Sequence, residues 1–304
     1  MRVVGSLTTM PDKYNKIIRT LKCLNNQTYK LDAIYLSLPN KSRRLGISYP
    51  PLPKEVSELC TIVPCTDYGP ITKIVGGLLM EHDPDTVIIT FDDDIIYPPN
   101  VVEALLKHHI DYPNSAIGSS GMLLSGNCPM CAITPNDDIF THRIPKFPVP
   151  PEGRRVDSIW GYPGALYVRK FFPVENSLEE KFLKYALIND DMLKNDDIVL
   201  SGYLSMNNIE RRIFANMPIT PDMVDETTSQ RVRVESEISY DLFKFFKSMN
   251  KAITSTKEIG MYSMPEPMSM SETIAGIIII VCLSVLLIII ITIYLLLSPN
   301  PSIP

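Results

Sequence analysis

Residues 87–94 read Val-Ile-Ile-Thr-Phe-Asp-Asp-Asp, an apolar stretch followed directly by three carboxylates. A continuous apolar run of this kind is typical of a strand that is covered on both faces. In open α/β sheets, ligands bind beyond the carboxyl ends of the strands. We therefore predict a central strand over residues 87–91 that carries Asp92, Asp93 and Asp94 into a crevice.

The three carboxylates concentrate negative charge that must be offset. Two carboxylates about 4 Å apart repel each other by about 4 kcal/mol at an effective dielectric constant of about 20. A cation or well-placed hydrogen-bond donors would offset this repulsion, and an all-oxygen ligand set favours Mg²⁺ or Mn²⁺ over zinc. Such an ion commonly completes its coordination with substrate phosphates. The alternative is a solvated acidic turn that caps the next helix.

Strand and helix signals alternate around this stretch. Runs typical of strands lie at residues 3–7, 33–38, 61–63 and 116–118. Apolar side chains recur at helical spacing at residues 14–21, 71–78 and 102–106. Strands separated by helices imply βαβ units. The predicted fold class is therefore α/β, with a mostly parallel, Rossmann-like central sheet flanked by helices.

The periodicity is weaker in the second half of the chain. Residues 125–155 are rich in proline and polar residues, which predicts a long surface loop near the site. Residues 159–168 have strand character that Gly161 and Gly164 interrupt. Two helices are predicted farther along, at residues 178–187 and 198–206. These segments extend the α/β domain over residues 1–235.

Composition excludes two broad classes of protein. Hydrophobic residues make up 45 % of the 304 residues and charged residues 21 %, which fits a folded core and excludes a disordered chain. Lys and Arg number 29 against 34 Asp and Glu, a formal charge of −5, and no basic run is interleaved with aromatic residues. The sequence therefore predicts no nucleic-acid partner.

The C-terminal region carries a separate signal. No charged residue occurs from Ile274 to Leu297, and a helix of this length reaches about 36 Å, enough to cross a hydrocarbon layer of about 30 Å. Lysines precede this stretch and no basic residue follows it. We expect a single-pass, C-terminal transmembrane helix at residues 273–297, a short tail at 298–304, and a main domain that faces the cytoplasm. The alternative is a buried core helix.

Residues 236–272 are predicted to form a juxtamembrane amphipathic helix and a linker. The apolar face of this helix consists of Leu242, Phe245, Phe246, Met249 and Ile253, and lysines occupy another face. Two arrangements are open. The basic helix lies on anionic lipid, with about 1 kcal/mol for each lysine near the surface, or its apolar face packs on the α/β domain.

Four short segments follow one another in a recognisable order. They are Ser6-Leu-Thr-Thr-Met-Pro11, Asp67-Tyr-Gly-Pro-Ile-Thr-Lys73, the segment from Val87 to Pro98, and Asn195-Asp-Asp-Ile-Val-Leu-Ser201. Together they resemble the motifs of GT-A fold, glycosyltransferase-2-like proteins, including those of large DNA viruses. The resemblance covers about residues 3–213. It implies a metal-dependent hexosyltransferase that uses a nucleotide-sugar donor, with a UDP-sugar favoured by family habit.

The resemblance implies roles for the first three segments. Asp94 would be the direct ligand of Mn²⁺ or Mg²⁺, with Asp92 directed toward the ribose or the metal. Lys73, at a helix N-terminus, would lie where positive charge favours phosphate, although a plain surface lysine is the alternative. The whole implied donor-binding set is Thr8, Thr9, Asp67, Lys73, Asp92 and Asp93. Lys13 lies near a position where relatives often carry arginine.

The resemblance also implies a catalytic base and a sugar pocket. Asp197 would take the proton of the acceptor hydroxyl, with Asp196 as the second candidate unless it only caps the following helix. Relatives that invert the anomeric configuration often have Glu-Asp at these two positions, so inversion and retention both stay open. The neighbouring Asp190 and Asp191 are further candidates for the role of base. The pocket between donor sugar and acceptor would consist of Trp160, Gly161, Tyr162 and Gly164, with core packing as the alternative role of Trp160. His142 is either a late metal ligand or structural.

Three functions compete at this point. The favoured one is a glycosyltransferase, inverting with an Asp base, that acts on a hydroxyl of a glycan, a protein or a lipid-linked acceptor. The second is a catalytically inactive, membrane-anchored scaffold or binding protein on the same fold. The third is a sugar nucleotidyltransferase, but that class has a glycine-rich phosphate loop after the first strand, and residues 8–11 contain no glycine.

Overall fold

The computed structural model describes residues 1–124, 149–161, 164–215, 217 and 248–262, and the backbone of residues 131–133 and 222–223. The chain divides into two compact units, Met1–Ser263 and Met264–Pro304, and the second lies outside the described residues. The predicted transmembrane helix at 273–297 therefore lies outside them too, as do His142 and Tyr162. Where the chain is described, every helix is too short or too polar to span a bilayer.

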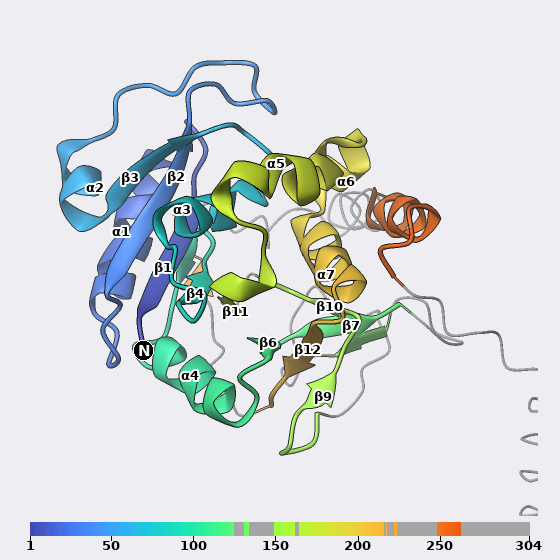
Figure 1. Cartoon of the computed structure of the whole chain (residues 1–304). Helices are drawn as coiled ribbons and strands as arrows, with labels where there is room; N and C mark the ends of the chain where they lie inside the picture. Colours follow the sequence, from blue (N-terminus) through green and yellow to red (C-terminus); the bar gives the residue numbers. More distant parts are fainter. Residues whose placement is uncertain are drawn as a thin grey trace, which may run out of the picture. The chain divides into compact units, whose positions relative to one another are not determined.

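An eight-stranded sheet forms the centre of the first unit (Figure 1). Its strands are β1 (Val3–Thr8), β2 (Ala33–Pro39), β3 (Thr61–Cys65), β4 (Val87–Thr90), β6 (Ser115–Gly118), β9 (Arg154–Arg155), β11 (Ala165–Val168) and β12 (Glu210–Ile213). The order is β3-β2-β1-β4-β11-β6-β12-β9. Strands β3, β2, β1 and β4 run parallel, whereas β11 and β9 are antiparallel to their neighbours. The sheet is thus mixed and mostly parallel, and the α/β class is confirmed.

Helices cover both faces of this sheet (Figure 1). They are α1 (Tyr14–Asn25), α2 (Lys54–Leu59), α3 (Thr72–Met80), α4 (Val101–Asp111), α5 (Leu178–Lys181), α6 (Asp190–Lys194) and α7 (Asp196–Met206). Ile88 of β4 packs in the core beneath α3 and α7, whereas Val87 and Ile89 pack in the core beneath α1 and α4. The central strand predicted from the apolar run is therefore buried on both faces.

Several elements differ from the expectations. Residues 131–133 and 154–155, predicted to be loop, form β8 (Cys131–Ile133) and β9, because their partners lie in β7 (Gly121–Leu123) and β12. The helix predicted over 178–187 is broken into α5 and a 3₁₀ segment, η4 (Leu183–Leu187). The fully buried Phe182 lies at the break, and its ring packs against that of Tyr203 with the ring centroids 4.5 Å apart.

Residues 248–262, which we call the C-terminal strap, pack on the first unit. A helix spans residues 248–258 of the strap. Its residues Met249, Ala252 and Ile253 are buried, and Met261 and Tyr262 at its end join the same core as α7. Of the two arrangements open for the amphipathic helix, the structure shows packing on the α/β domain for Met249 and Ile253. Leu242, Phe245 and Phe246 lie outside the described residues.

We expect a chain that ends at residue 247 to be less stable than a chain that ends at residue 263. The shorter chain uncovers the part of the core that Met249, Ile253, Met261 and Tyr262 close. The expected loss is about 3 kcal/mol, comparable to one large-to-small core substitution. Urea unfolding of both chains measures the difference. Equal midpoints and slopes would show that the strap contributes no stability.

Candidate functional site

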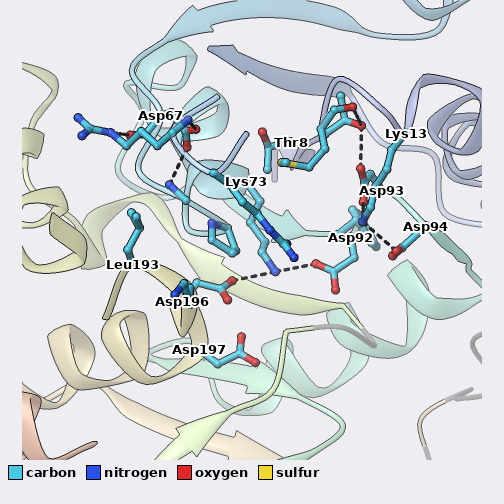
Figure 2. Close-up of a pocket in the computed structure, with 18 of the residues that line it drawn as sticks. Thr8, Lys13, Asp67, Lys73, Asp92, Asp93, Asp94, Leu193, Asp196 and Asp197 are labelled. Atoms are coloured by element: carbon cyan, nitrogen blue, oxygen red, sulfur yellow. Dashed lines mark hydrogen bonds and ion pairs between the residues drawn. The ribbon is translucent and has the colours of Figure 1, made fainter. Parts of the chain in front are cut away.

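A cavity of about 550 Å³ lies beyond the carboxyl ends of β1, β3 and β4 (Figure 2). All the motif segments that follow these strands contribute to its wall, and so does the α6–α7 region. The lining residues include Thr8, Thr9, Met10, Lys13, Arg43, Arg44, Tyr49, Asp67, Lys73, Asp92, Asp93, Asp94, Asp190, Leu193, Lys194, Asp196 and Asp197. The cavity therefore occupies the edge of the sheet where α/β proteins bind ligands.

Asp93 is the buried member of the triplet. Its carboxylate accepts hydrogen bonds from Thr9 Oγ1 at 2.7 Å and from Lys13 Nζ at 3.1 Å, and its backbone oxygen accepts one from Thr20 Oγ1 at 3.0 Å. Burial, together with the charge of Asp94, raises the pKa of Asp93 even though Lys13 and Thr9 act in the opposite direction. Asp93 thus ties the turn after β1 to the turn after β4.

Lys13 offsets the negative charge of Asp93 and Asp94. Its Nζ lies 2.9 Å from Asp94 Oδ2 as well as near Asp93. Burial disfavours the charged ammonium, but the two carboxylates outweigh burial and raise the pKa of Lys13. Lys13 therefore supplies a positive charge beside the triplet, in the form of an ammonium that has no planar face.

Lys73 joins the two acidic motifs (Figure 2). Its Nζ lies 2.6 Å from Asp92 Oδ1 and 2.9 Å from Asp196 Oδ2. The residue is 7 % exposed, so the alternative of a surface lysine is wrong. Burial would lower the pKa of its ammonium, but Asp196, Asp92 and Asp197 together raise that pKa well above its usual range. Lys73 is therefore a buried, permanently charged cation at neutral pH.

The backbone N–H groups of Lys73 and its two neighbours are already paired. The N–H groups of Thr72, Lys73 and Ile74 donate to the carbonyls three residues earlier. A helix N-terminus attracts anions mainly when such groups are unpaired. The positively charged group that this segment presents to the cavity is the ammonium of Lys73.

Asp67 braces the rim of the cavity. One carboxylate oxygen accepts from the N–H of Arg43 and the other from the N–H of Gly69, both at 2.7 Å. Gly69 has φ +74, and a Cβ there would lie 2.3 Å from the backbone oxygen of Leu193. Only glycine fits this close approach of the α3 turn to α6. Asp67 therefore holds two rim segments together, with both oxygens engaged by the backbone.

Thr8 and Thr9 lie at the end of β1 and line the cavity. Thr8 Oγ1 donates to the backbone oxygen of Ser37 at 2.9 Å, and the hydroxyl of Tyr49 donates to the backbone oxygen of Thr9 at 2.9 Å. These bonds attach the turn after β1 to β2 and to the proline-rich segment. The wall on this side is therefore held by side-chain contacts to the main chain.

Asp196 and Asp197 form the first turn of α7, with Asn195 at the N-cap position. The helix begins two positions earlier than predicted, so Asp196 is not the cap residue. Asp197 Oδ1 accepts a hydrogen bond from the N–H of Gly161 at 3.0 Å. Burial and the adjacent charge of Asp196 raise the pKa of Asp197 well above its usual range, although Lys73 acts in the opposite direction. Asp197 thus holds a proton at a pH where an ordinary carboxyl has lost it.

The described residues of the segment predicted as a sugar pocket do not line the cavity, although Gly161 adjoins Asp197, which does. A Cβ at Gly161 would lie 3.0 Å from Asp197 Oδ1 and 3.5 Å from Lys73 Nζ, so glycine permits both groups to approach the backbone. Trp160 is partly buried and packs against the core shared with α7. Gly164 has φ +92 and lies nearest to Phe91. Within the described residues, Gly161 is the member of this segment that adjoins the candidate base.

Other lining residues had no signal in the sequence. Arg43, Arg44 and Tyr49 come from an irregular segment between β2 and α2, and Leu193 and Lys194 come from α6. Residues without periodicity or motif cannot be placed from local pattern. Helix α6 has one local signal, since Asn189 caps it by accepting from the N–H groups of Asp191 and Met192.

No family model matches the chain, and no curated protein matches its sequence. Solved structures similar to it include the crystal structure of S. aureus TarS 1-349 in complex with UDP, at 9 % identity and a TM-score of 0.39, over 71 % of this chain and 58 % of that chain. The crystal structure of S. aureus TarS gives 9 % identity and a TM-score of 0.41, over 71 % of this chain and 35 % of that chain. The chain thus spans about three fifths of the first of these TarS chains and about a third of the second.

Proposed function

We propose that this chain is a metal-dependent glycosyltransferase of the GT-A fold that moves a sugar from a nucleotide-diphosphate donor, preferably a UDP-sugar, to an acceptor hydroxyl. The observation that carries the proposal is the pair of contacts from Lys73 to Asp92 and Asp196 in one cavity. They bring the acidic motif after β4 and the acidic motif of α7 together around a buried cation. A donor diphosphate and a catalytic base need this proximity.

The positive charges of the cavity suit a diphosphate leaving group. Negative charge develops on the departing phosphate as its bond to the anomeric carbon breaks. Lys13 and Lys73 place ammonium groups in the cavity wall, and donors placed where charge develops are worth most in a site that excludes water. Lys73 is buried, so its charge is weakly screened.

The carboxylates fit Mg²⁺ or Mn²⁺ bound together with a diphosphate. The side chains of Asp92 and Asp94 are 28 % and 26 % exposed, and each uses one oxygen in its contact with a lysine. Magnesium is commonly held by one or two carboxylates plus substrate phosphates. Across the described part of the chain, no group of three or more His, Cys, Asp or Glu is arranged to hold an ion without substrate. When bound, the ion supplies Lewis-acid neutralisation of the diphosphate charge.

Asp197 is proposed as the base that takes the proton of the acceptor hydroxyl in an inverting reaction. A base is most effective when its pKa lies near the working pH, and the raised pKa of Asp197 moves it in that direction. Asp196 is held in an ion pair by the ammonium of Lys73, so one of its oxygens is already engaged. The N–H of Gly161 orients the carboxylate of Asp197.

We also propose that the uncharged segment at residues 273–297 anchors the enzyme in a membrane with the α/β domain on the cytoplasmic side. The support is the sequence of the segment and the lysines that precede it. A lipid-linked or membrane-protein acceptor would suit this position. Cysteines engineered on either side of the segment, treated with a thiol reagent that does not cross the membrane, would establish the orientation from which of them reacts.

Calorimetry of the full-length chain with UDP tests the proposal. We expect Mn²⁺ alone to bind weakly and UDP to bind at least about 10-fold more tightly with Mn²⁺ than without it, because the ion and the diphosphate complete one site. Incubation with a panel of UDP-sugars should then release UDP slowly. Binding without release, even with a panel of acceptors, would favour the inactive binding protein. Release of a nucleoside triphosphate on addition of pyrophosphate would favour the nucleotidyltransferase.

A further inference from the structure

The C-terminal strap begins beside the residue that precedes the candidate bases. Asn195 Nδ2 donates to Ser248 Oγ at 3.1 Å, and Ser248 Oγ donates to Asp191 Oδ1 at 2.8 Å. Asn195 is the N-cap residue of α7 and comes directly before Asp196. Lys251, one turn farther along the strap, lies 3.7 Å from Asp191. The start of the strap therefore holds the entrance to α7.

The strap ends beside the residue that follows the candidate bases. The hydroxyl of Tyr262 donates to the backbone oxygen of Ile198 at 2.7 Å. Tyr262 is 6 % exposed, and the hydroxyl of Ser158 donates to the backbone oxygen of Asp197, the residue before Ile198, at 3.1 Å. The two ends of the strap thus contact the two residues that flank Asp196 and Asp197.

The end of the strap packs closely against α7 at Gly202. A Cβ at Gly202 would lie 3.1 Å from Met261 Cβ and 3.2 Å from Tyr262 Cε2. Gly202 lies one turn after Ile198, so both residues face the end of the strap. A Cβ at this position would require Met261 or Tyr262 to shift by a few tenths of an ångström.

The first turn of α7 needs such support. Asp196 and Asp197 are adjacent like charges, and Asp92 lies on the other side of Lys73. When Asp197 is deprotonated, its repulsion from Asp196 favours a frayed turn in which the two carboxylates separate, and helix ends are where local unfolding costs least. Contacts on both flanks of the pair oppose this fraying.

We propose that Ser248 and Tyr262 are positioning residues, which hold the first turn of α7 so that Asp197 stays on the N–H of Gly161 and faces the cavity. The effect of these residues on catalysis rests on the proposed function. Their support of the first turn of α7 from both flanks can be measured without any substrate.

Amide hydrogen exchange of the full-length chain tests the structural content. In the double variant Ser248→Ala/Tyr262→Phe, we expect the amides of residues 195–202 to exchange about 10-fold faster, because two hydrogen bonds to this turn are lost. Amides of α3 and β4 should be unchanged. The matched control is Tyr203→Phe, since Tyr203 is also 6 % exposed and lies on α7, and its backbone oxygen keeps the hydrogen bond from Asn207 Nδ2 at 2.8 Å. Unchanged exchange at 195–202 in the double variant would overturn the proposal.

Donor hydrolysis by the same variants tests the catalytic consequence. We expect the double variant to lose about 10-fold in kcat with KM for the UDP-sugar within about 2-fold, because the donor side of the cavity is untouched and only the base is misplaced. The acid limb of its pH profile should move, whereas Tyr203→Phe should keep the wild-type profile. Faster exchange with an unchanged kcat and pH profile would overturn the positioning role. Absence of turnover in the wild-type chain would instead overturn the proposed function, and exchange would still decide whether the strap holds the turn.

Discussion

Asp197→Asn is expected to lower turnover of the UDP-sugar by about 1000-fold while leaving donor affinity within about 3-fold. A positioned general base contributes about 100- to 10,000-fold, and a carboxamide can accept the hydrogen bond from Gly161 but cannot take a proton. Donor affinity should be preserved because, in the proposed reaction, Asp197 acts on the acceptor hydroxyl and not on the donor diphosphate. Steady-state release of UDP and calorimetry with UDP measure the two quantities.

The turnover of the wild-type chain should depend on pH in a direction set by the pKa of Asp197. The base works deprotonated, and its pKa is raised, so wild-type kcat should fall as the pH falls through a value well above that of an ordinary aspartate. The same raised pKa means that the charged form of Asp197 costs folding free energy above that pH. Asp197→Asn should therefore unfold at the same or a higher temperature near neutral pH, so that lost turnover is not lost fold.

Asp196→Asn is the matched comparison for this experiment. It removes the neighbouring carboxylate and its contact with Lys73 but leaves the hydrogen bond from Gly161 to Asp197. We expect it to keep an acid limb in the pH profile and most of the turnover. If Asp196→Asn loses turnover and Asp197→Asn keeps it, the base is Asp196. If both keep it, neither carboxylate is the base.

The double variant Asp92→Asn/Asp94→Asn is expected to weaken Mn²⁺-dependent binding of UDP by about 100-fold or more. Loss of a residue that only supports a metal ligand costs about 10- to 100-fold in metal affinity, so loss of the carboxylates themselves should cost at least as much. Binding of UDP without metal should not fall, because Lys73 loses one competing carboxylate and keeps its charge. The ratio of the two affinities by calorimetry is the readout.

A carboxylate at the other end of the same strand provides the control. Asp85 precedes β4, is exposed, and pairs only at the surface with Lys170. Asp85→Asn should bind UDP as the wild type does, with and without Mn²⁺. An unchanged metal dependence in the Asp92/Asp94 variant would show that these carboxylates do not hold the ion.

The parts of the fold that could be predicted are those that depend on local pattern. The apolar run before Asp92 predicts a central strand because only a strand covered on both faces contains no polar alternation, and β4 is buried on both faces. Helices α1, α3 and α4 follow from apolar residues at helical spacing, and each begins within two residues of its prediction. The α/β class follows from the alternation of these elements.

The pairing within the sheet could not be predicted in the same way. Strand β11 lies antiparallel between β4 and β6, although nothing in residues 165–168 specifies a direction. Direction depends on the route of the connecting segments. The strap is a similar case, since its amphipathic pattern predicts an apolar face but not the surface that covers it.

For the candidate site, the sequence alone was sufficient to propose a role for Asp92, Asp93 and Asp94, because three adjacent carboxylates after a buried strand need a cation or hydrogen-bond donors nearby. Asp196 and Asp197 were proposed from the resemblance of their segment to a known motif. Only the tertiary structure supplied their partners. Lys73 forms ion pairs with both acidic motifs, and Lys13 forms ion pairs with Asp93 and Asp94. Asp67 accepts hydrogen bonds from backbone N–H groups with both of its oxygens. These roles depend on distances between segments remote in sequence, and such distances arise only when the sheet, α7 and the strap pack together.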